Sequence, residues 1–156
     1  MAIKDMMVKD VTFQRLAPLA VTKYWSLIQQ CLMDSLSGQK AAAGYRERLM
    51  EAVQSGKIQV WSALATGTDT PILIGMVFTQ RMTDPMLGTS ELLIYGLSLR
   101  AQMAPEGYAH CLYVLEDYAK KNGCQSMRAQ TAVRGVQRLL ESNGWTAGAV
   151  PLVKEI

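Results

Sequence analysis

The chain has 156 residues, of which 49% are hydrophobic and 19% are charged, a balance typical of one globular domain with a full hydrophobic core. Its apolar runs are far shorter than the roughly 20 residues of a membrane-spanning helix, so no membrane segment is expected. The net charge of +3 is too small to indicate nucleic-acid binding by overall charge. The single histidine, His110, argues against a histidine-rich metal site.

The N-terminal third of the chain predicts an edge strand followed by two helices. Residues 11–16 alternate loosely and include β-branched and aromatic side chains, which is typical of a strand. Apolar residues recur every three or four positions over 19–36 and again over 41–55, so both segments are predicted to form amphipathic helices. The N-terminus lacks the uninterrupted apolar stretch of a secretion signal, and we therefore expect a cytoplasmic protein.

The middle of the chain predicts three strands. Residues 58–65 and 72–80 are expected to pair as a hairpin, because Gly67 and Pro71 mark a turn between them. Residues 91–99 follow, and this segment is too apolar on both faces for a half-exposed strand. We therefore expect it to be a central strand that is buried on both sides.

A crossover helix over 105–122 and a further strand over 124–131 are predicted after the central strand. Pro105 suits the first turn of a helix, where its missing N–H is not needed, and Gly123 suits the left-handed residue just past the last turn. The three elements together predict a parallel βαβ unit, whose ligand-binding end is the carboxyl end of the first strand.

A short helix over 134–143 and a last strand, formed by Trp145 and residues 150–156, complete the predicted elements. Their order is β-α-α-β-β-β-α-β-α-β, an antiparallel meander followed by one parallel crossover. This order predicts an α/β fold with a mixed sheet and helices on both faces. Because the sequence shows no repeat, linker or low-complexity segment, residues 1–156 are expected to form a single domain.

This order of elements resembles the GNAT superfamily of acyl-CoA N-acyltransferases. The family's signature is a Gln/Arg-x-x-Gly-x-Gly/Ala loop after the fourth strand, whose N–H groups hold the diphosphate of coenzyme A at a helix N-terminus. In this chain Gly107 and Ala109 match the signature. Ala104 replaces the Gln or Arg, Pro105 removes an amide donor, and Glu106 adds a negative charge. The resemblance therefore implies acetyl-CoA as the donor, held by a degraded loop.

The resemblance also implies donor-binding residues along the fourth strand. Gly96 interrupts this strand, and in the family a bulge lies there beside the thioester; a glycine that relieves a packing clash is the alternative. Backbone groups after the bulge would then bind the pantetheine arm and polarise the thioester carbonyl. The implied donor-binding set comprises Leu97, Leu99, Arg100, Gln102, Gly107, Tyr108 and Ala109.

Candidate catalytic groups are few. Members of the family often carry a tyrosine in the last helix as the general acid for the departing thiolate, and Leu140 occupies that place here. Glu91 and Tyr95, on the fourth strand, are the nearby groups that titrate, and they are the candidate base and acid. A tyrosine that only packs in the core is the other interpretation of Tyr95.

A second resemblance covers the C-terminal region. The pattern Arg134-Gly-x2-Arg138-Leu, with Arg128 on the preceding strand, is similar to divergent GNAT-like proteins encoded by bacteriophages and prophages. The three guanidinium groups are a candidate site for an anion or a protein partner, since Arg134 and Arg138 share one helix face. An ordinary solvated basic face is the alternative.

Two functions from different classes stay open at this point. The first is an acyl-CoA-dependent N-acetyltransferase whose acceptor is a small-molecule amine, a protein N-terminus or a lysine. The second is a non-catalytic module of the same fold that binds a protein partner, virion-associated if the chain is phage-derived. Met82 and Met86 offer an adaptable contact surface, so a homodimer also stays open.

Overall fold

The computed structural model describes residues 7–8, 10–35, 42–67, 69–131, 133–148 and 152–156. Its centre is a five-stranded mixed sheet whose strands lie side by side in the order of the chain. The neighbouring pairs are antiparallel except for the last pair, which is parallel. The strands are β2 (Val11–Arg15), β3 (Ile58–Ala65), β4 (Ile72–Thr83), β5 (Ser90–Leu99) and β7 (Ser126–Ala129).

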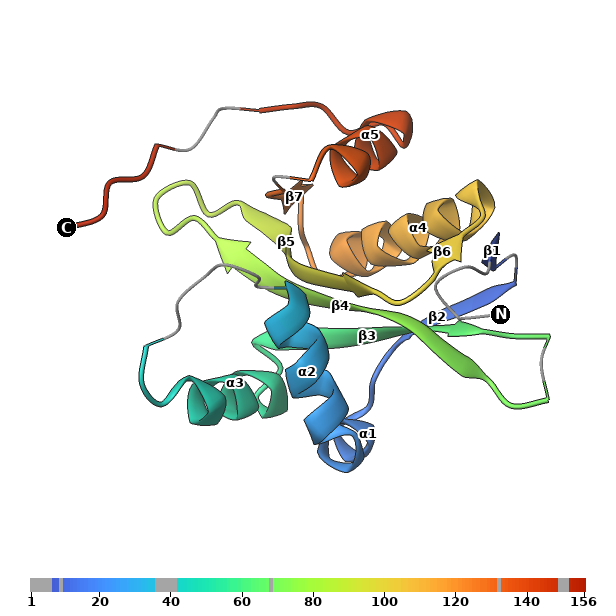
Figure 1. Ribbon diagram of the computed structural model, residues 1–156. Coiled ribbons are helices and arrows are strands. Elements are labelled where there is room, and N and C mark those ends of the chain that lie inside the picture. Colours follow the sequence, from blue (N-terminus) through green and yellow to red (C-terminus); the bar gives the residue numbers. More distant parts are fainter. Residues whose placement is uncertain (1–6, 9, 36–41, 68, 132, 149–151) are drawn as a thin grey trace.

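Helices cover both faces of this sheet (Figure 1). One face carries α1 (Pro18–Lys23), α2 (Trp25–Ser35) and α3 (Tyr45–Gln54), and the other carries α4 (Pro105–Lys121), with α5 (Arg134–Ser142) beside it. A separate parallel pair, β1 (Met7–Val8) with β6 (Gln102–Met103), lies near the start of α4. The predicted mixed α/β layer with helices on both faces is confirmed.

Two apolar cores result, one on each face of the sheet. The core under α4 includes Phe13, Trp61, Ile74, Cys111 and Leu115, and the core under α1–α3 includes Val21, Ile28, Leu32, Val60 and Phe78. Val60 and Trp61 are neighbours on β3 and belong to different cores, as the two-residue period of a strand requires.

A buried polar chain crosses the α4 side of the sheet. The Trp61 indole Nε1–H donates to Thr79 Oγ1 at 2.9 Å, and Thr79 Oγ1 donates to Gln59 Oε1 at 2.8 Å. Gln59 in turn donates to the Gly56 carbonyl at 2.6 Å. Since Thr79 is fully buried, these bonds satisfy groups that water does not reach.

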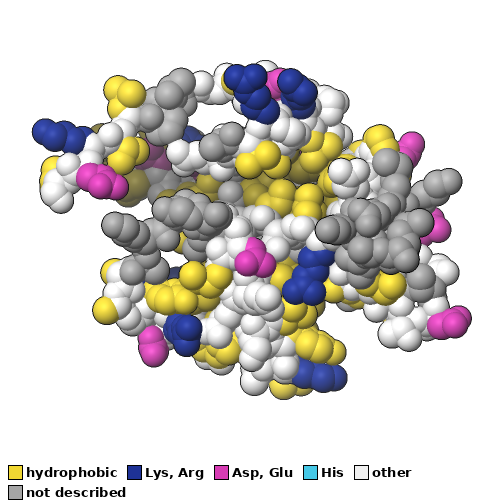
Figure 2. All heavy atoms as spheres, in the orientation of Figure 1, with side chains coloured by type: hydrophobic (Ala, Val, Ile, Leu, Met, Phe, Trp, Pro, Cys, Tyr) yellow, Lys and Arg dark blue, Asp and Glu magenta, His cyan; other side chains and the backbone are white. Residues whose placement is uncertain are grey.

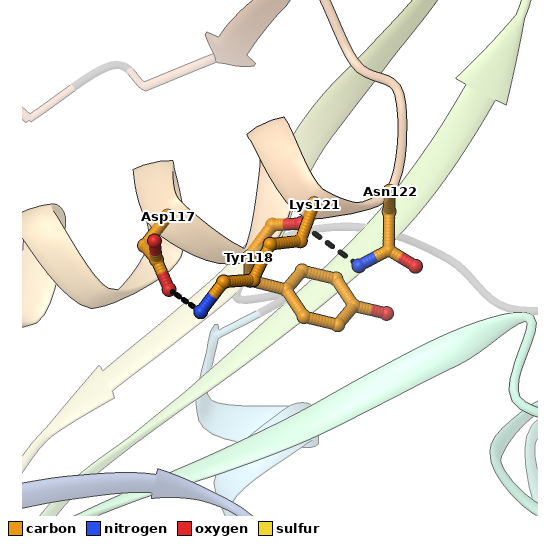
Figure 3. A network of polar contacts seen from close by, with 4 residues as sticks. All are labelled: Asp117, Tyr118, Lys121 and Asn122. Atoms are coloured by element: carbon orange, nitrogen blue, oxygen red, sulfur yellow. Dashed lines mark hydrogen bonds and ion pairs between the residues drawn. The ribbon is translucent and has the colours of Figure 1, made fainter.

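The ends of α4 are formed as the sequence predicts. Pro105 lies in the first turn, and Gly123 adopts a φ of +75° just past the last turn. Figure 3 shows the last turn, where the Asn122 side chain donates to the Tyr118 carbonyl at 2.8 Å and Lys121 pairs with Asp117 at 2.7 Å. The helix that connects β5 with β7 therefore begins at Pro105 and ends before Gly123, as the sequence predicts.

Several predicted boundaries differ from the structure. The helix predicted over 19–36 is two helices that break at Tyr24, whose φ of −106° and ψ of 23° are not helical. The helix predicted over 41–55 begins at Tyr45, because Gly44 before it adopts a φ of +76°. Residues 36 and 41 lie outside the described part of the chain.

The predicted last strand is wrong for the residues that the structure describes. Neither 145–148 nor 152–156 forms a strand. Leu152 and Val153 are 94% and 86% exposed, so their apolar side chains are almost fully open to solvent. The apolar pattern of this tail resembled a strand, but pattern alone does not supply the partner strand that a sheet edge needs. Residues 149–151 lie outside the described range.

The central strand was predicted to be buried on both faces, and this holds only for part of β5. Leu92 is fully buried, whereas Tyr95 and Leu99 are each 41% exposed. The difference arises because β7 accompanies only the first half of β5, as described below. Among the described residues, no helix combines the length and the apolar character needed to cross a membrane.

Candidate functional site

The main irregularity of the sheet is the divergence of its two parallel strands. β5 and β7 pair from Glu91 with Ser126 to Ile94 with Ala129, and no further. β5 continues to Leu99, still paired with β4 on its other side. Residues 95–99 therefore form an open strand edge. Along it, the N–H and C=O groups that point away from β4 are not paired with β7. Such an edge can bind an extended ligand through the backbone.

A β-bulge lies at the point where the two strands separate. Phe78 is opposite Gly96 and Thr79 is opposite Ile94, so Tyr95 is the extra residue on β5. The bulge that Gly96 suggested is confirmed. The packing interpretation of the glycine holds as well, because a Cβ atom on Gly96 would collide with the hydroxyl of Ser35 and lie 3.2 Å from the Ser35 Cβ.

The divergence opens into an apolar cavity of about 240 Å³, which we call the β5–β7 cleft. In the space-filling view, hydrophobic side chains gather in the middle of the molecule between the helices above and below the sheet (Figure 2). The sheet, α4 and α5 all contribute walls. Its lining residues include Phe13, Ala63, Val77, Tyr95, Leu97, Leu99, Met103, Cys111, Leu115, Val133, Val136, Leu139 and Leu140.

Most polar groups at the cleft already have partners. The Tyr108 hydroxyl accepts a hydrogen bond from the Met103 N–H at 3.3 Å, and Thr131 Oγ1 accepts one from the Val133 N–H at 3.0 Å. The Ser35 hydroxyl donates to the Leu32 carbonyl at 2.7 Å. The part of the cleft lined by these residues therefore favours an apolar ligand, which needs no hydrogen bond.

Cys111 lines the cleft from α4 and is 7% exposed. Burial raises the pKa of its thiol from 9.0 to about 11. The side chain is thus a neutral thiol at physiological pH. It contributes apolar surface to the cleft and is not an activated nucleophile.

Of the two candidate catalytic groups, only Tyr95 lies at the cleft. Tyr95 is a lining residue of the cavity and lies at the bulge. Glu91 lies near the opposite end of β5, where its carboxylate Oε1 is 3.1 Å from Arg128 Nε. Glu91 is not among the residues that line the cavity. The structure therefore separates the predicted base from the predicted acid and gives Glu91 a cationic partner.

Leu97 and Leu99, two of the implied donor-binding residues, lie on the open half of β5 and line the cleft. Arg100 is held by its backbone, since its N–H donates to the Ile74 carbonyl at 2.8 Å. Gln102 belongs to β6 and stands opposite Met7 of β1. The segment between β5 and α4 therefore contains β6, which forms a small parallel pair with β1.

The first turn of α4 does not present the amide cradle that the resemblance implied. The Gly107 N–H donates to the Ala104 carbonyl at 2.9 Å, and the Tyr108 N–H approaches the same oxygen at 3.4 Å. Gly107 is buried, and a Cβ atom there would lie 3.2 Å from Met103 Cβ and 3.4 Å from Val11 Cγ2. This glycine permits close packing of α4 on β2 and β6. Ala109 lies two positions on, on the exposed side of the helix.

The three arginines of the predicted anion site divide into two groups. Arg128, on β7, pairs with Glu91. Arg134 and Arg138 lie on the exposed face of α5, opposite the apolar residues that line the cleft. Because Arg128 is bonded to Glu91, the predicted anion site is reduced to Arg134 and Arg138, both exposed on α5.

Sequence reasoning missed the residues that shape the inner end of the cleft. Ala63 and Gly75 lie opposite each other on β3 and β4, and both line the cavity. Small residues in two adjacent strands were the available signal. Recognising it required the strand register, which the sequence alone did not provide.

Comparison with known proteins shows what this architecture is similar to. No protein-family model and no curated protein matches the sequence. Solved structures do match. An aminoglycoside acetyltransferase from an uncultured soil metagenomic sample, in complex with sisomicin, has a TM-score of 0.68 at 15% identity, with 94% of this chain and 95% of that chain covered.

Two further matches have comparable scores. A GNAT family acetyltransferase from Staphylococcus aureus has a TM-score of 0.63 at 15% identity, with 94% of this chain and 98% of that chain covered. AAC(6')-Iy, in complex with the bisubstrate analogue CoA-S-monomethyl-acetylneamine, has a TM-score of 0.67 at 11% identity and coverages of 94% and 99%. At these identities the likeness is one of fold.

Proposed function

Because the chain has the fold of the GNAT acetyltransferases, we propose that it is an acyl-CoA-dependent N-acyltransferase that binds the thioester end of its donor in the β5–β7 cleft. The observation that carries this proposal is the divergence of β5 and β7 beside the bulge at Tyr95. The structural neighbour solved with a CoA bisubstrate analogue supports a donor of this class.

The open half of β5 suits the pantetheine arm of the donor. Pantetheine is a thin chain that contains two amide groups, and the strand edge at 95–99 offers alternating N–H and C=O groups to such a chain. The arm would lie as an added strand in the place that β7 vacates, and the thioester would point into the apolar cavity.

The other end of coenzyme A fits the chain less well. The Gly107 amide is already bonded to Ala104, and Glu106 places an exposed carboxylate in the same turn. A diphosphate would find one negative charge and no free Gly107 amide there. In this proposal, therefore, most of the affinity for the donor comes from the pantetheine and the acyl group.

The chemistry that the cleft supports is direct transfer. The acceptor amine attacks the thioester carbonyl, a C–N bond forms and the C–S bond breaks. A backbone N–H on the open edge of β5 would stabilise the oxyanion, and bound geometry would supply much of the rate. The departing thiolate takes a proton from the Tyr95 hydroxyl, and the proton of the attacking amine passes to water. Tyr95 thereby acts as the general acid, a role that Leu140 in α5 cannot take because it has no hydroxyl.

The acceptor is an amine. The structural neighbour crystallised with sisomicin supports a small-molecule amine as a first choice, with a protein N-terminus or a lysine as the other classes. Because Glu91 does not line the cleft and is paired with Arg128, the predicted carboxylate is not placed to act as the general base. The acceptor is therefore expected to react as the free amine, and the rate should rise with pH towards the pKa of that amine.

A second candidate is a non-catalytic protein that keeps the fold and binds a ligand or partner. The bonded Gly107 amide and the ion pair of Glu91 favour it, because each removes a group that catalysis by the fold would use. Binding without turnover distinguishes the two candidates. In that case the cleft would hold an acyl thioester, and no thiol would appear when amines are added.

The experiment is a thiol-release assay with acyl-CoA donors and a panel of amines, coupled to calorimetric titration of the same donors. Val136→Lys places a charge in the cleft wall, whereas Gln137→Lys places the same charge on the exposed side of α5. Val136→Lys should remove donor binding, and Gln137→Lys should leave it unchanged. Equal donor binding by both variants would refute the assignment of the cleft.

A further inference from the structure

A row of four residues across the sheet forms the floor of the β5–β7 cleft. The register places Phe13 of β2 opposite Ala63 of β3, Ala63 opposite Gly75 of β4, and Gly75 opposite Leu99 of β5. All four line the cavity. Paired residues of antiparallel strands point to the same face of a sheet, so this floor faces α4.

The row runs from a mouth to a closed end. Leu99 is 41% exposed at the mouth, while Phe13 and Ala63 are 6% and 3% exposed. The roof above the closed end comes from Met103 and Leu115, which are equally buried. The cleft therefore extends from the open edge of β5 inwards beneath α4.

Small side chains keep the closed end hollow. At Gly75 a Cβ atom would lie 2.9 Å from the Ser98 carbonyl oxygen and 3.0 Å from Leu99 Cδ2, so Leu99 already lies over this glycine. Ala63 lines the cavity with a side chain that is a single methyl group. Ala63 is thus the position where a larger side chain would fill the inner part of the cleft.

The size of the hollow fits more than an acetyl group. A dry apolar cavity of about 150 Å³ binds benzene, a molecule of six carbons. In proportion, the 240 Å³ of the whole cleft, which the acyl group would share with the thioester end of the donor, holds on the order of ten carbons. An acetyl group offers a single methyl to this space and would leave most of the apolar wall without contacts, which costs binding free energy.

From this geometry we infer that the acyl group transferred is a medium-length apolar chain of about six to ten carbons, bound beneath α4 with Ala63 at its inner end. This inference rests on the proposed function, because it assumes that the thioester lies at the bulge of β5. The product is then an N-acylated amine with an apolar tail, and the thiol of the donor leaves with one proton.

The apolar character of the side chains around the closed end also fits a hydrocarbon chain. The five side chains around the closed end are those of Phe13, Ala63, Met103, Cys111 and Leu115, none of which carries a charge. A sugar, a nucleoside or a charged acyl group would lose its hydrogen bonds to water there without replacement. A saturated hydrocarbon chain loses none.

The test uses thioesters of graded length. S-acyl pantetheines and acyl-CoAs with two to fourteen carbons are titrated by calorimetry and assayed for thiol release with an amine acceptor. Burial of each methylene should strengthen binding about fourfold up to about eight to ten carbons. Longer chains should gain nothing further.

Two variants fill the cleft from different walls. Ala63→Leu and Cys111→Leu should each shift the optimum to shorter chains and weaken octanoyl binding at least tenfold, while acetyl binding stays the same. Ala65→Leu is the matched control for the first variant, since Ala65 lies on the same strand and face, is equally buried, and does not line the cleft. Its overpacking lowers stability similarly, and the chain-length profile should not change.

The outcomes separate this inference from the proposed function. Transfer of acetyl and octanoyl groups with equal efficiency would overturn the inference and leave the transferase intact. Chain-length-dependent binding whose optimum Ala63→Leu shifts to shorter chains, without turnover for any amine, would support the acyl-chain site beneath α4 and refute the proposed catalysis. An unchanged chain-length profile in both filling variants, each shown to be folded by its thermal transition, would also overturn the inference.

Discussion

Adding one methyl group at Gly96 should disturb the bulge of β5 and the end of α2 together. The Cβ of an alanine at this position would occupy the space of the Ser35 hydroxyl, and it would lie 3.2 Å from the Ser35 Cβ and 3.6 Å from Phe78 Cδ2. The Ser35 hydroxyl is not free to rotate without loss, because it donates to the Leu32 carbonyl at 2.7 Å. Either α2 or β5 must therefore shift.

The expected cost of Gly96→Ala is that of overpacking a well-packed core, about 1–3 kcal/mol in the free energy of unfolding. For a chain of this size that corresponds to a fall in melting temperature of roughly 2–4 °C per kcal/mol. Ser35→Ala removes the colliding oxygen and leaves the contact between the two Cβ atoms, which a shift of a few tenths of an ångström relieves. By itself Ser35→Ala should cost only about 0.5–1.5 kcal/mol, for the lost hydrogen bond.

The assay is urea unfolding of the wild type, the two single variants and the double variant. If the collision is real, the double variant should be at least as stable as Gly96→Ala, and the coupling free energy of the cycle should be about 1–2 kcal/mol in the rescuing direction. Strictly additive losses would refute the reasoning, as would a Gly96→Ala variant with wild-type stability. Either result would mean that α2 does not pack on the bulge as described.

Three further predictions concern the core, the cleft and the donor. Thr79→Val should lower the free energy of unfolding by about 2–5 kcal/mol, because it leaves the Trp61 N–H without an acceptor and Gln59 Oε1 without a donor; the same change at the exposed Thr12 should be nearly neutral in urea unfolding, and equal effects would contradict the account. Tyr95→Phe should reduce kcat for thiol release about 10²- to 10⁴-fold with donor affinity preserved, and an unchanged kcat would exclude the tyrosine as the acid. Because burial raises the pKa of Cys111 from 9.0 to about 11, ionisation of this thiol opposes folding: the stability it contributes should be constant below pH 9 and fall as the pH rises towards 11, and Cys111→Ala should flatten that decline in pH-dependent denaturation curves.

The main elements of the fold were predictable because each left a strong local signal. The three- and four-residue spacing of apolar side chains in α4, with Pro105 at its start and Gly123 just past its end, predicted the bounds of the crossover helix closely. The turn residues between β3 and β4 fixed the hairpin. Gly96 in an otherwise apolar strand correctly indicated the bulge. In each case the information lies within a few consecutive residues.

Features that depend on distant partners were not predictable in the same way. The tail at 152–156 has the composition of a strand, but a strand requires a neighbour, and Leu152 is 94% exposed. Gly107 matches a phosphate-binding signature, yet its N–H is bonded to Ala104 and its small size serves the packing of Val11 and Met103. A glycine in a sequence pattern does not reveal which of these two uses it has.

The candidate site was predictable where its residues belong to one strand, and unpredictable where they depend on the strand register. Tyr95, Leu97 and Leu99 belong to one strand, so placing the strand placed them at the cleft. Glu91 belongs to that strand as well, but its role depends on Arg128 across the sheet, which only the register of β5 with β7 brings near. The cavity at Ala63 depends on the registers of four strands at once, so the small residues Ala63 and Gly75 could not be recognised as its wall from the sequence alone.

The measurement that tests the central claim most directly is a calorimetric titration of the wild-type protein with acetyl-CoA, octanoyl-CoA and free coenzyme A at moderate salt. The account predicts saturable binding of the acyl thioesters, with octanoyl-CoA binding far more tightly than free coenzyme A, and loss of this binding in Val136→Lys but not in Gln137→Lys. An absence of binding for every thioester at millimolar concentration would contradict the account, because the β5–β7 cleft would then not be a donor site.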